Sequence, residues 1–151
     1  LQTSLVSIFF IFISIQWLTK YKLGAGDIRL LSFQKTGFSL ETILILFIQS
    51  IIRTSFLEEI VFRGFLINFL KGKFGFNKIN HIQATIFSAL HIFAMVGFSL
   101  VDILAGTIII YILSLYFGKL TRKSGDSIFY SSVFHGSLNI IAGLIFILMA
   151  I

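Results

Sequence analysis

Two carboxylates and one guanidinium interrupt an apolar stretch of the chain, within residues 56–64. One ionised side chain near the middle of a membrane helix costs about 2.5–3.5 kcal/mol, so three of them this close together predict partners, water or a functional site. Glu59 and Arg63 are four residues apart and share one helical face, where they can form an ion pair. Glu58 faces another side of the helix. A carboxylate that has no ion-pair partner on its own helix and lies in apolar surroundings is suited to act as a general base or acid.

Two histidines and an asparagine add polar groups to later apolar stretches. His91 follows Phe87 by four residues and His135 precedes Asn139 by four, so each pair projects from one helical face. A single histidine in a membrane helix can simply hydrogen-bond a neighbouring backbone, but ionisable residues on several such helices indicate a functional site. A carboxylate, two imidazoles and an amide can deprotonate water and donate hydrogen bonds to a developing oxyanion. Together with Glu58, these residues predict hydrolytic chemistry without a nucleophilic side chain.

The composition places this chemistry in a membrane. Hydrophobic residues make up 57% of the 151 residues and charged residues 12%, whereas soluble domains carry about a quarter charged residues. The chain has no cysteine, which excludes disulfides, thiolate nucleophiles and thiolate metal ligands. Its net charge of +6 comes from Lys and Arg in short loops between apolar stretches. This pattern is typical of cytoplasmic loops and does not predict nucleic-acid binding.

Apolar helices must position the polar residues. We expect helices at residues 1–18, 39–70, 82–96, 100–117 and 128–151. Ser39 is the expected cap of the second helix, and an interfacial helix is expected at residues 28–33. Because the chain starts within an apolar run and not with Met, we expect it to lack upstream sequence. The predicted fold class is all-α: a polytopic transmembrane helix bundle that forms one domain over residues 1–151 and encloses an intramembrane polar cavity.

The loops predict an orientation. The basic loops at residues 71–81 and 119–126 are separated by two crossings, so both are expected on one face, which we assign to the cytoplasm. The uncharged turn at residues 97–99 is expected on the other face. Asp102 and Asp126 lie near expected helix starts, where we expect them to act as caps. The site is expected to open towards the first of the two basic loops.

Three motifs, in this order on three apolar helices, carry a resemblance to a known family: Glu58-Glu59-x-x-x-Arg63-Gly64, Phe87-x-x-x-His91 and His135-x-x-x-Asn139. The chain resembles the CPBP family of intramembrane glutamic endopeptidases, named for CAAX proteases and bacteriocin-processing proteins and also called the Abi family. The resemblance covers about residues 43–151, the expected catalytic core. It implies membrane helices around a conical cavity that opens to the cytoplasm. This chain has fewer expected helices than typical members and lacks the proline that many carry before the paired glutamates.

The resemblance also implies a role for each motif residue. Glu58 and His91 are the implied pair that activates a water molecule for peptide hydrolysis. His135 and Asn139 are the implied donors to the oxyanion. The implied supporting residues are Glu59, Arg63 and Phe87. No metal or other cofactor is expected.

Other functions fit the same residues. Glu58 with two histidines also matches the ligands of a catalytic zinc ion, although the chain has no His-Glu-x-x-His motif and the resemblance favours a metal-free reaction. A proton-coupled transporter could use these groups as a proton relay, but the sequence shows no inverted repeat. A third alternative is a non-catalytic membrane partner such as an immunity protein. As a peptidase, the chain is expected to be a multi-pass protein of the cell membrane that contacts lipids and takes a prenylated CAAX-type or leader-peptide substrate.

Overall fold

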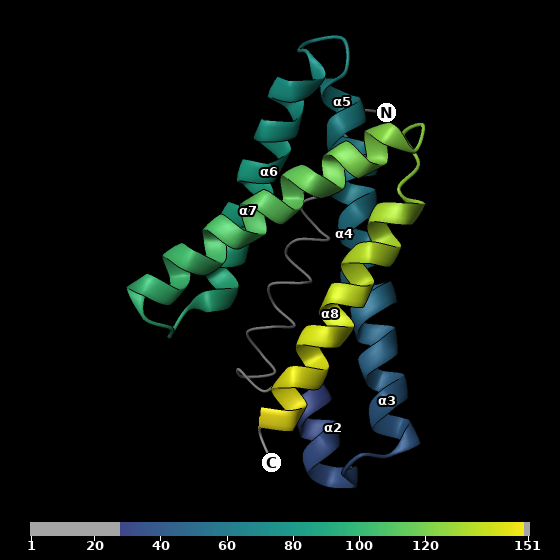
Figure 1. Ribbon diagram of the computed structural model, residues 1–151, viewed down its shortest axis with the longest axis vertical. Coiled ribbons are helices and arrows are strands. Elements are labelled where there is room, and N and C mark those ends of the chain that lie inside the picture. Colours follow the sequence, from purple (N-terminus) through teal and green to yellow (C-terminus); the bar gives the residue numbers. More distant parts are fainter. Residues whose placement is uncertain (1–27, 150–151) are drawn as a thin grey trace. The chain divides into compact units, whose positions relative to one another are not determined.

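The computed structural model of the chain describes residues 28–149, and all regular elements within this range are helices (Figure 1). The predicted all-α fold class is therefore confirmed. The helix predicted at residues 1–18 lies outside the described residues. The chain divides into two compact units, Phe47–Ala142 and a smaller one whose described part is residues 28–46 and 143–149. The assignment of a single domain stays a prediction.

The described part of the smaller unit begins with α2 (Ile28–Thr36). This helix confirms the short helix predicted from residue 28, but it ends at Thr36 instead of residue 33. Gly37 then turns the chain with a φ of 62°, and α3 (Leu40–Phe47) follows. The Ser39 hydroxyl accepts a hydrogen bond from the Thr42 amide at 3.3 Å, which confirms the predicted cap.

The helix that carries the two glutamates covers Leu40–Leu70, as predicted. After α3 it continues through η1 (Ile48–Phe56), α4 (Leu57–Glu59), η2 (Ile60–Leu66) and α5 (Ile67–Leu70). Both η segments are π-helical, a wider winding that is frequent at functional sites. In η1 the hydroxyl of Ser55 donates to the carbonyl oxygen of Ser50, five residues earlier, at 2.6 Å. The two glutamates therefore lie on one α-helical turn between two π-helical stretches.

The next helix, α6 (Phe76–Ile92), differs from the prediction at both ends. The predicted loop over residues 71–81 is shortened to residues 71–75, so the helix starts at Phe76 instead of residue 82. It ends at Ile92 instead of residue 96 and is followed by the 3₁₀ turn η3 (Phe93–Met95).

The start of α6 was predicted wrongly because its polar residues were interpreted as a solvated loop. Asn80 is buried, and its side-chain amide donates to the carbonyl oxygen of Leu115 at 3.0 Å. His81 is exposed but lies on the helix, with its Nδ1 2.7 Å from the Tyr111 hydroxyl. A polar side chain that finds a partner on a neighbouring helix does not end its own helix.

The helix α7 (Leu100–Lys123) runs past its predicted end at residue 117. Arg122 and Lys123, which were expected in a loop, form its last turn, where positive charge complements the helix dipole. The last helix, α8 (Phe129–Met149), starts one position after the predicted residue 128, and residues 150–151 lie outside the described range.

The turn between α7 and α8 uses two residues with left-handed backbone, Gly125 at φ 71° and Asp126 at φ 66°. Asp126 does not cap α8 as predicted. Its Oδ2 accepts Lys71 Nζ at 2.8 Å and Arg122 Nη1 at 3.4 Å instead, so this carboxylate joins the two basic segments.

Asp102 does lie at the predicted helix start. Its amide donates to the Ser99 hydroxyl at 3.2 Å, and its carboxylate accepts from the same hydroxyl at 2.6 Å.

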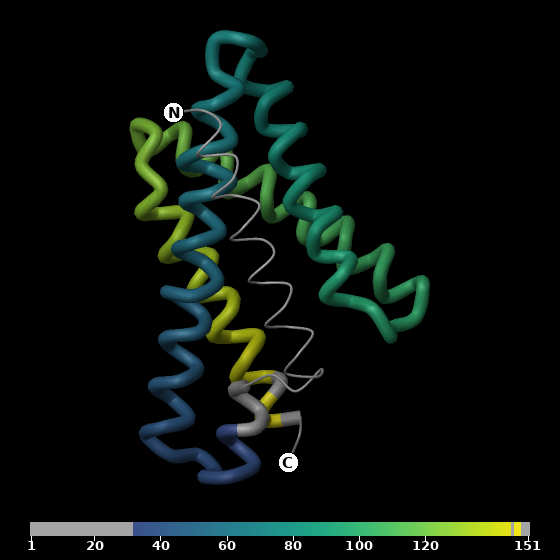
Figure 2. The backbone as a smooth tube through the Cα atoms, turned by 180° about the vertical axis from the view of Figure 1, so that it is seen from behind, coloured from purple at the N-terminus to yellow at the C-terminus, as the bar shows by residue number. Residues whose placement is uncertain are grey.

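Within Phe47–Ala142, α6 and α7 form an antiparallel hairpin, which can be followed from both sides in Figures 1 and 2. Gly118 allows the close approach of the two helices, because a Cβ atom at this position would collide with the side chain of Asn80. The first part of α8 packs along η1. There a Cβ atom on Gly136 would lie 3.1 Å from Ile51 Cγ1.

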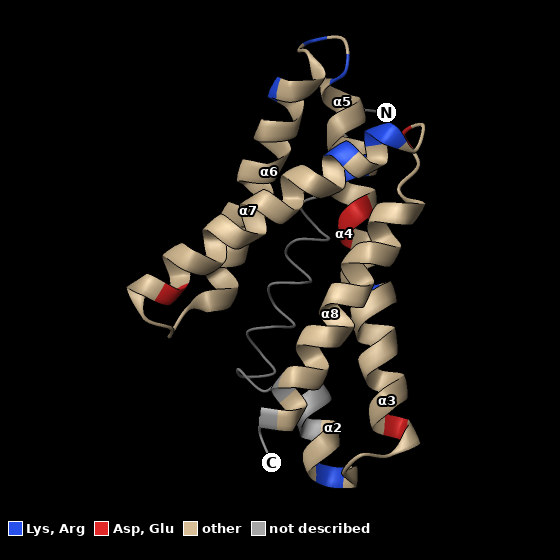
Figure 3. Ribbon diagram, in the orientation of Figure 1, with Lys and Arg blue, Asp and Glu red and all other residues tan. Residues whose placement is uncertain are grey.

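This unit buries several polar and charged side chains and exposes many large apolar ones. Glu59, Arg63 and Gln83 are at most 1% exposed, whereas Val101 is 74% exposed. Leu40–Leu70 and Leu100–Lys123 are long and apolar enough to span a membrane, and the stretch Phe129–Ile145 within α8 is apolar but shorter. Figure 3 shows the acidic residues of α4 in the middle part of the long helix Leu40–Leu70. It shows Lys and Arg in the α5–α6 loop and at the end of α7. The fold is an all-α helical bundle that buries polar groups in its larger unit, and two of its helices could span a membrane.

Candidate active site

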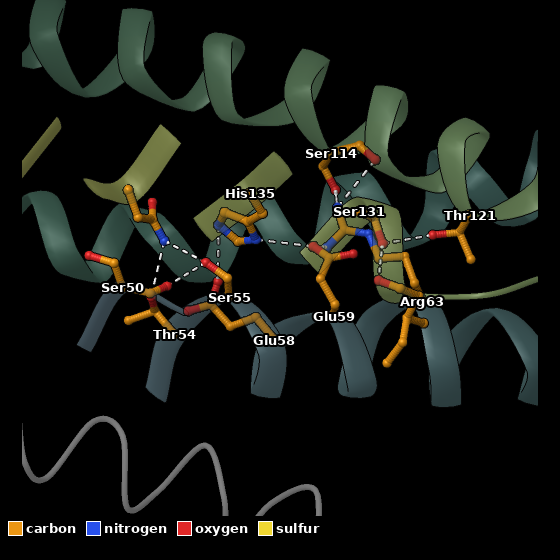
Figure 4. A network of polar contacts seen from close by, with 12 residues as sticks. Ser50, Thr54, Ser55, Glu58, Glu59, Arg63, Ser114, Thr121, Ser131 and His135 are labelled. Carbon is orange, nitrogen blue, oxygen red and sulfur yellow. Dashed lines mark hydrogen bonds and ion pairs between the residues drawn. The ribbon is translucent and has the colours of Figure 1, made fainter. Parts of the chain in front are cut away.

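The seven residues predicted for the site all lie in the unit Phe47–Ala142. The glutamate helix supplies Glu58, Glu59 and Arg63; α6 supplies Phe87 and His91; α8 supplies His135 and Asn139. Figure 4 shows the polar network that these helices form, with Glu59 between His135 and Arg63. Three segments that are distant in the sequence therefore contribute to one network.

Glu59 and Arg63 form the ion pair that their spacing predicts. Arg63 Nη1 donates to Glu59 Oε1 at 2.9 Å, and both side chains are fully buried. Arg63 Nη2 donates to the Ser114 hydroxyl at 2.7 Å and to the Ser114 carbonyl oxygen at 3.2 Å. The guanidinium also lies 4.7 Å from the ring centroid of Phe87 and 5.3 Å from that of Phe117, within the range of cation–π attraction. These contacts hold the buried charges in one arrangement.

The network continues from Ser114 into α6. The Ser114 hydroxyl, which accepts from Arg63, donates its own proton to Gln83 Oε1 at 3.2 Å. Gln83 Nε2 donates to Asn80 Oδ1 at 2.9 Å and to the Ser114 carbonyl oxygen at 3.0 Å. None of these three residues was predicted from the sequence. Their only signal was polarity within apolar stretches, which is too common in membrane helices to select them.

His135 connects the two glutamates. Its Nδ1 lies 3.0 Å from Glu59 Oε1 and its Nε2 lies 3.8 Å from Glu58 Oε2. Glu59 Oε1 already accepts from Arg63, so we assign the proton of the His135–Glu59 contact to Nδ1 of His135. In the neutral ring Nε2 is then an acceptor, and it becomes a donor only when the ring is an imidazolium. The contact with Glu59 therefore occupies Nδ1 of His135 and leaves Nε2 facing Glu58.

His91 is oriented by its own helix. Its Nδ1 lies 2.7 Å from the carbonyl oxygen of Phe87, which can only accept, so Nδ1 again carries the proton. The other ring nitrogen, Nε2, faces Glu58 Oε2 at a distance of 4.0 Å. The Phe87 ring is buried, and its centroid lies 4.4 Å from that of the His91 ring. Phe87 thus supports His91 with its backbone and with its ring.

Glu58 lies opposite both imidazoles without a direct hydrogen bond to either. Its Oε2 is 3.8 Å from His135 Nε2 and 4.0 Å from His91 Nε2, beyond the usual limit of about 3.2 Å for such bonds. Polar groups at this separation are commonly bridged by a water molecule. The side chains of Glu58 and His91 are 22% and 26% exposed, so this part of the network is accessible, in contrast to Glu59.

Asn139 is held by two hydroxyls of η1. Its Nδ2 donates to Thr54 Oγ1 and to Ser55 Oγ, at 3.0 Å each. Ser55 donates its hydroxyl proton to the carbonyl oxygen of Ser50, and Thr54 donates to that of Gln49 or Ser50, so both hydroxyls can accept from the amide. These hydroxyls were missed in the sequence, although a signal exists. Thr54 and Ser55 precede Glu58 and Glu59 by four residues each, which puts all four on adjacent helical stripes.

Within residues 28–149, no group of three His, Cys, Asp or Glu side chains is arranged to hold a metal ion. The metal-free reaction and the zinc alternative both stay open to experiment. A groove of about 460 Å³ lies between α7 and α8, lined by Tyr116, Leu120, Phe129, Tyr130, Val133, Phe134 and Ser137. None of the predicted site residues lines this groove, and the polar cavity predicted around Glu58 stays a prediction.

A comparison with protein families gives a match over most of the described chain. The family model of the Rce1-like type II CAAX prenyl endopeptidases matches residues 40–141. This range contains all seven predicted site residues. No curated protein and no solved structure matches the chain significantly.

Proposed function

Because this chain belongs to the family of Rce1-like type II CAAX prenyl endopeptidases, we propose that it cleaves a peptide bond within the membrane with a water molecule activated by Glu58 and His91. Membership of the family makes the chain a membrane peptidase. The catalytic residues, the absence of a metal and the substrate are our proposal. The observation that carries it is the position of Glu58 Oε2, 4.0 Å from His91 Nε2 and 3.8 Å from His135 Nε2.

We place the attacking water between Glu58 and His91. In the neutral His91 ring Nε2 is an acceptor, because Nδ1 donates to the Phe87 carbonyl oxygen. A water molecule that donates one hydrogen to Nε2 and the other to the Glu58 carboxylate directs a lone pair away from both. As this lone pair forms a bond to the carbonyl carbon of the substrate, one proton of the water passes to the Glu58–His91 pair.

The carbonyl oxygen of the substrate becomes negatively charged in this step, and His135 and Asn139 are the proposed donors to it. His135 can donate from Nε2 only as an imidazolium, since its other proton is directed at Glu59. The Glu59 carboxylate stabilises that cation. Asn139 would exchange one of its two hydroxyl partners in η1 for the oxyanion.

The second half of the reaction returns the protons. The proton held by the Glu58–His91 pair passes to the leaving nitrogen, the C–N bond breaks, and the carbonyl forms again as a carboxylic acid. The carboxylic acid then passes its proton to the amine, so the products are a carboxylate and an ammonium group, and no oxidant or reductant is consumed. Glu58 and His91 return to their starting protonation states.

The proposed substrate is a prenylated CAAX-type protein or peptide, in keeping with the description of the family. Leader peptides of the bacteriocin type form a second substrate class to be tested. We propose a multi-pass location in the cell membrane, with the site open to the face that carries residues 71–75 and the turn at residues 124–127.

A cleavage assay with the chain reconstituted in lipid vesicles tests this function. The panel contains prenylated CAAX peptides, the same peptides without the prenyl group, and leader peptides, each with and without a metal chelator. We expect cleavage of the prenylated peptides, unchanged by the chelator and lost in Glu58→Gln and His91→Asn. Glu41→Gln and His81→Asn are matched controls, because they make the same chemical changes at exposed positions outside the site.

The possible results separate the alternatives. Activity that disappears with the chelator and returns with zinc would overturn the metal-free reaction. Cleavage of leader peptides alone would overturn the prenylated substrate. If no peptide of any class is cleaved while the chain remains folded, the transporter and the non-catalytic partner replace the peptidase.

A further inference from the structure

One end of the larger unit carries a concentration of positive charge that the proposed reaction does not use. Residues 71–78 and 119–126 contain six basic residues and one acidic residue. The basic residues, all exposed, are Lys71, Lys73, Lys78, Lys119, Arg122 and Lys123. We call them the basic end.

Side-chain contacts show that these two segments lie together. Lys71 Nζ is 2.8 Å from Asp126 Oδ2, and Arg122 Nη1 is 3.4 Å from the same oxygen. The Arg122 guanidinium also lies 5.7 Å from the ring centroid of Phe76, at the start of α6. The α5–α6 loop, the start of α6 and the end of α7 therefore lie close together, and Figure 3 marks their basic residues in blue.

Aromatic rings accompany the cations at this end. Lys73 Nζ lies 4.4 Å from the ring centroid of Phe69, and Lys78 Nζ lies 4.4 Å from that of Phe74. Phe74 is 41% exposed. Aromatic and basic side chains at the ends of membrane helices are typical of the zone where lipid headgroups meet the hydrocarbon.

We propose that the basic end binds the anionic headgroups of phospholipids in the adjoining face of the membrane. Exposed ammonium and guanidinium groups attract anionic headgroups, and each Lys or Arg close to such a surface contributes about fivefold in affinity. The exposed residue Phe74 provides an apolar contact at the same depth. Asp126 opposes this binding, because it neutralises part of the charge of Lys71 and Arg122.

The test measures lipid binding to the full chain in a neutral detergent, titrated with short-chain phosphatidylglycerol or phosphatidylcholine and followed by native mass spectrometry. We expect a preference for phosphatidylglycerol that falls by up to about 25-fold in Lys73→Gln/Lys78→Gln. Lys73→Arg/Lys78→Arg keeps both charges and should keep the preference. Asp126→Asn should increase it. Lys35→Gln is the matched control, since it removes an exposed charge from α2.

Thermal melts of all variants verify that each is folded. Because lipid binding is measured and peptide cleavage is not, the result does not depend on the proposed function. Equal binding of the two lipids would overturn the proposal, as would a loss of preference in Lys35→Gln as large as in the double variant. A competition arm with millimolar inorganic phosphate distinguishes a site for free anions from a surface for lipids. Complete displacement of phosphatidylglycerol by phosphate would refute the lipid surface, and retention of the lipid would support it.

Discussion

Two adjacent residues, Glu58 and Glu59, lie in opposite surroundings. Glu59 is fully buried and accepts short hydrogen bonds from Arg63 at 2.9 Å and from His135 at 3.0 Å. The side chain of Glu58 is 22% exposed, and its oxygen faces two imidazole nitrogens at 3.8 and 4.0 Å. One carboxylate is fixed by direct bonds, whereas the other faces its partners across a space that suits a water molecule.

From this difference we propose separate tasks for the two carboxylates. A buried pair with several hydrogen bonds provides a rigid support, because any movement would leave a charge without its partner. A partly exposed carboxylate next to two imidazoles can exchange protons with water and substrate. We infer that the Glu59 side of the network orients the site and the Glu58 side performs the chemistry. Substitutions on the two sides should therefore have different effects on activity and on stability.

The largest expected effect is on turnover. Glu58→Gln keeps the shape of the side chain but removes its ability to take a proton, so peptide cleavage should fall by about 10²–10⁴ with little change in the melting temperature. Turnover in vesicles and a thermal melt in detergent measure the two quantities. Glu41→Gln should leave both unchanged. A Glu58→Gln variant that unfolds would contradict the division of tasks, because it would make Glu58 the structural residue.

The next largest effect is on stability. Glu59→Gln leaves the Arg63 guanidinium buried without its counter-charge, which costs about 3–5 kcal/mol of unfolding free energy. Glu59→Gln combined with Arg63→Met should recover part of this loss, since the unpaired charge is gone. Unfolding in detergent at increasing denaturant measures the difference. If Glu59→Gln has wild-type stability, or if the double variant is less stable than the single one, Glu59 is not the structural support that we propose.

A smaller effect is expected at Ser114, which contacts the supporting side only. Ser114→Ala removes the hydroxyl between Arg63 and Gln83 and should cost about 1–3 kcal/mol, because two buried polar groups lose a partner. Turnover should fall together with stability, and Ser114→Thr should restore both. Ser137→Ala is the control, since that hydroxyl donates only to a carbonyl oxygen of its own helix. A loss of turnover at full stability would place Ser114 on the reacting side instead.

The smallest effect is expected at the exposed pair of Lys71 and Asp126. The hydrogen bond from Lys71 lowers the pKa of Asp126 from its usual value of 3.8. A lowered pKa in the folded state means that the pair stabilises the fold above the unfolded pKa, and that this contribution is lost as the pH falls through the folded value. Both side chains are more than a third exposed, so we expect less than about 1 kcal/mol.

Asp126→Asn tests this pair. At pH 7 the melting temperature of the variant should be slightly below that of the wild type, and at pH 3 the two should approach each other. A constant difference over this range would show that the effect of the substitution does not come from the charge.

Contacts within one helix could be predicted from the sequence. The pairing of Glu59 with Arg63 follows from a spacing of four residues, as does the position of His91 over the carbonyl group of Phe87. The helix boundaries at Phe76 and Lys123 were predicted wrongly, because side-chain polarity alone does not reveal whether a polar residue faces water or another helix. Asn80 shows this directly, since its partner is a backbone carbonyl group of α7.

The sequence by itself determined the membrane setting, the all-α class and the order of the three motifs. Only the tertiary structure decided that Nδ1 of His135 meets Glu59 across 76 positions of the chain, and that Asn139 binds Thr54 across 85. The physical reason is that helix geometry fixes neighbours within about one turn, whereas apolar faces can pack against one another in many registers. The register depends on close approaches such as those at Gly118 and Gly136, which act only when the helices are already side by side. It is this packing that makes one of two adjacent glutamates a buried support and leaves the other facing two imidazoles.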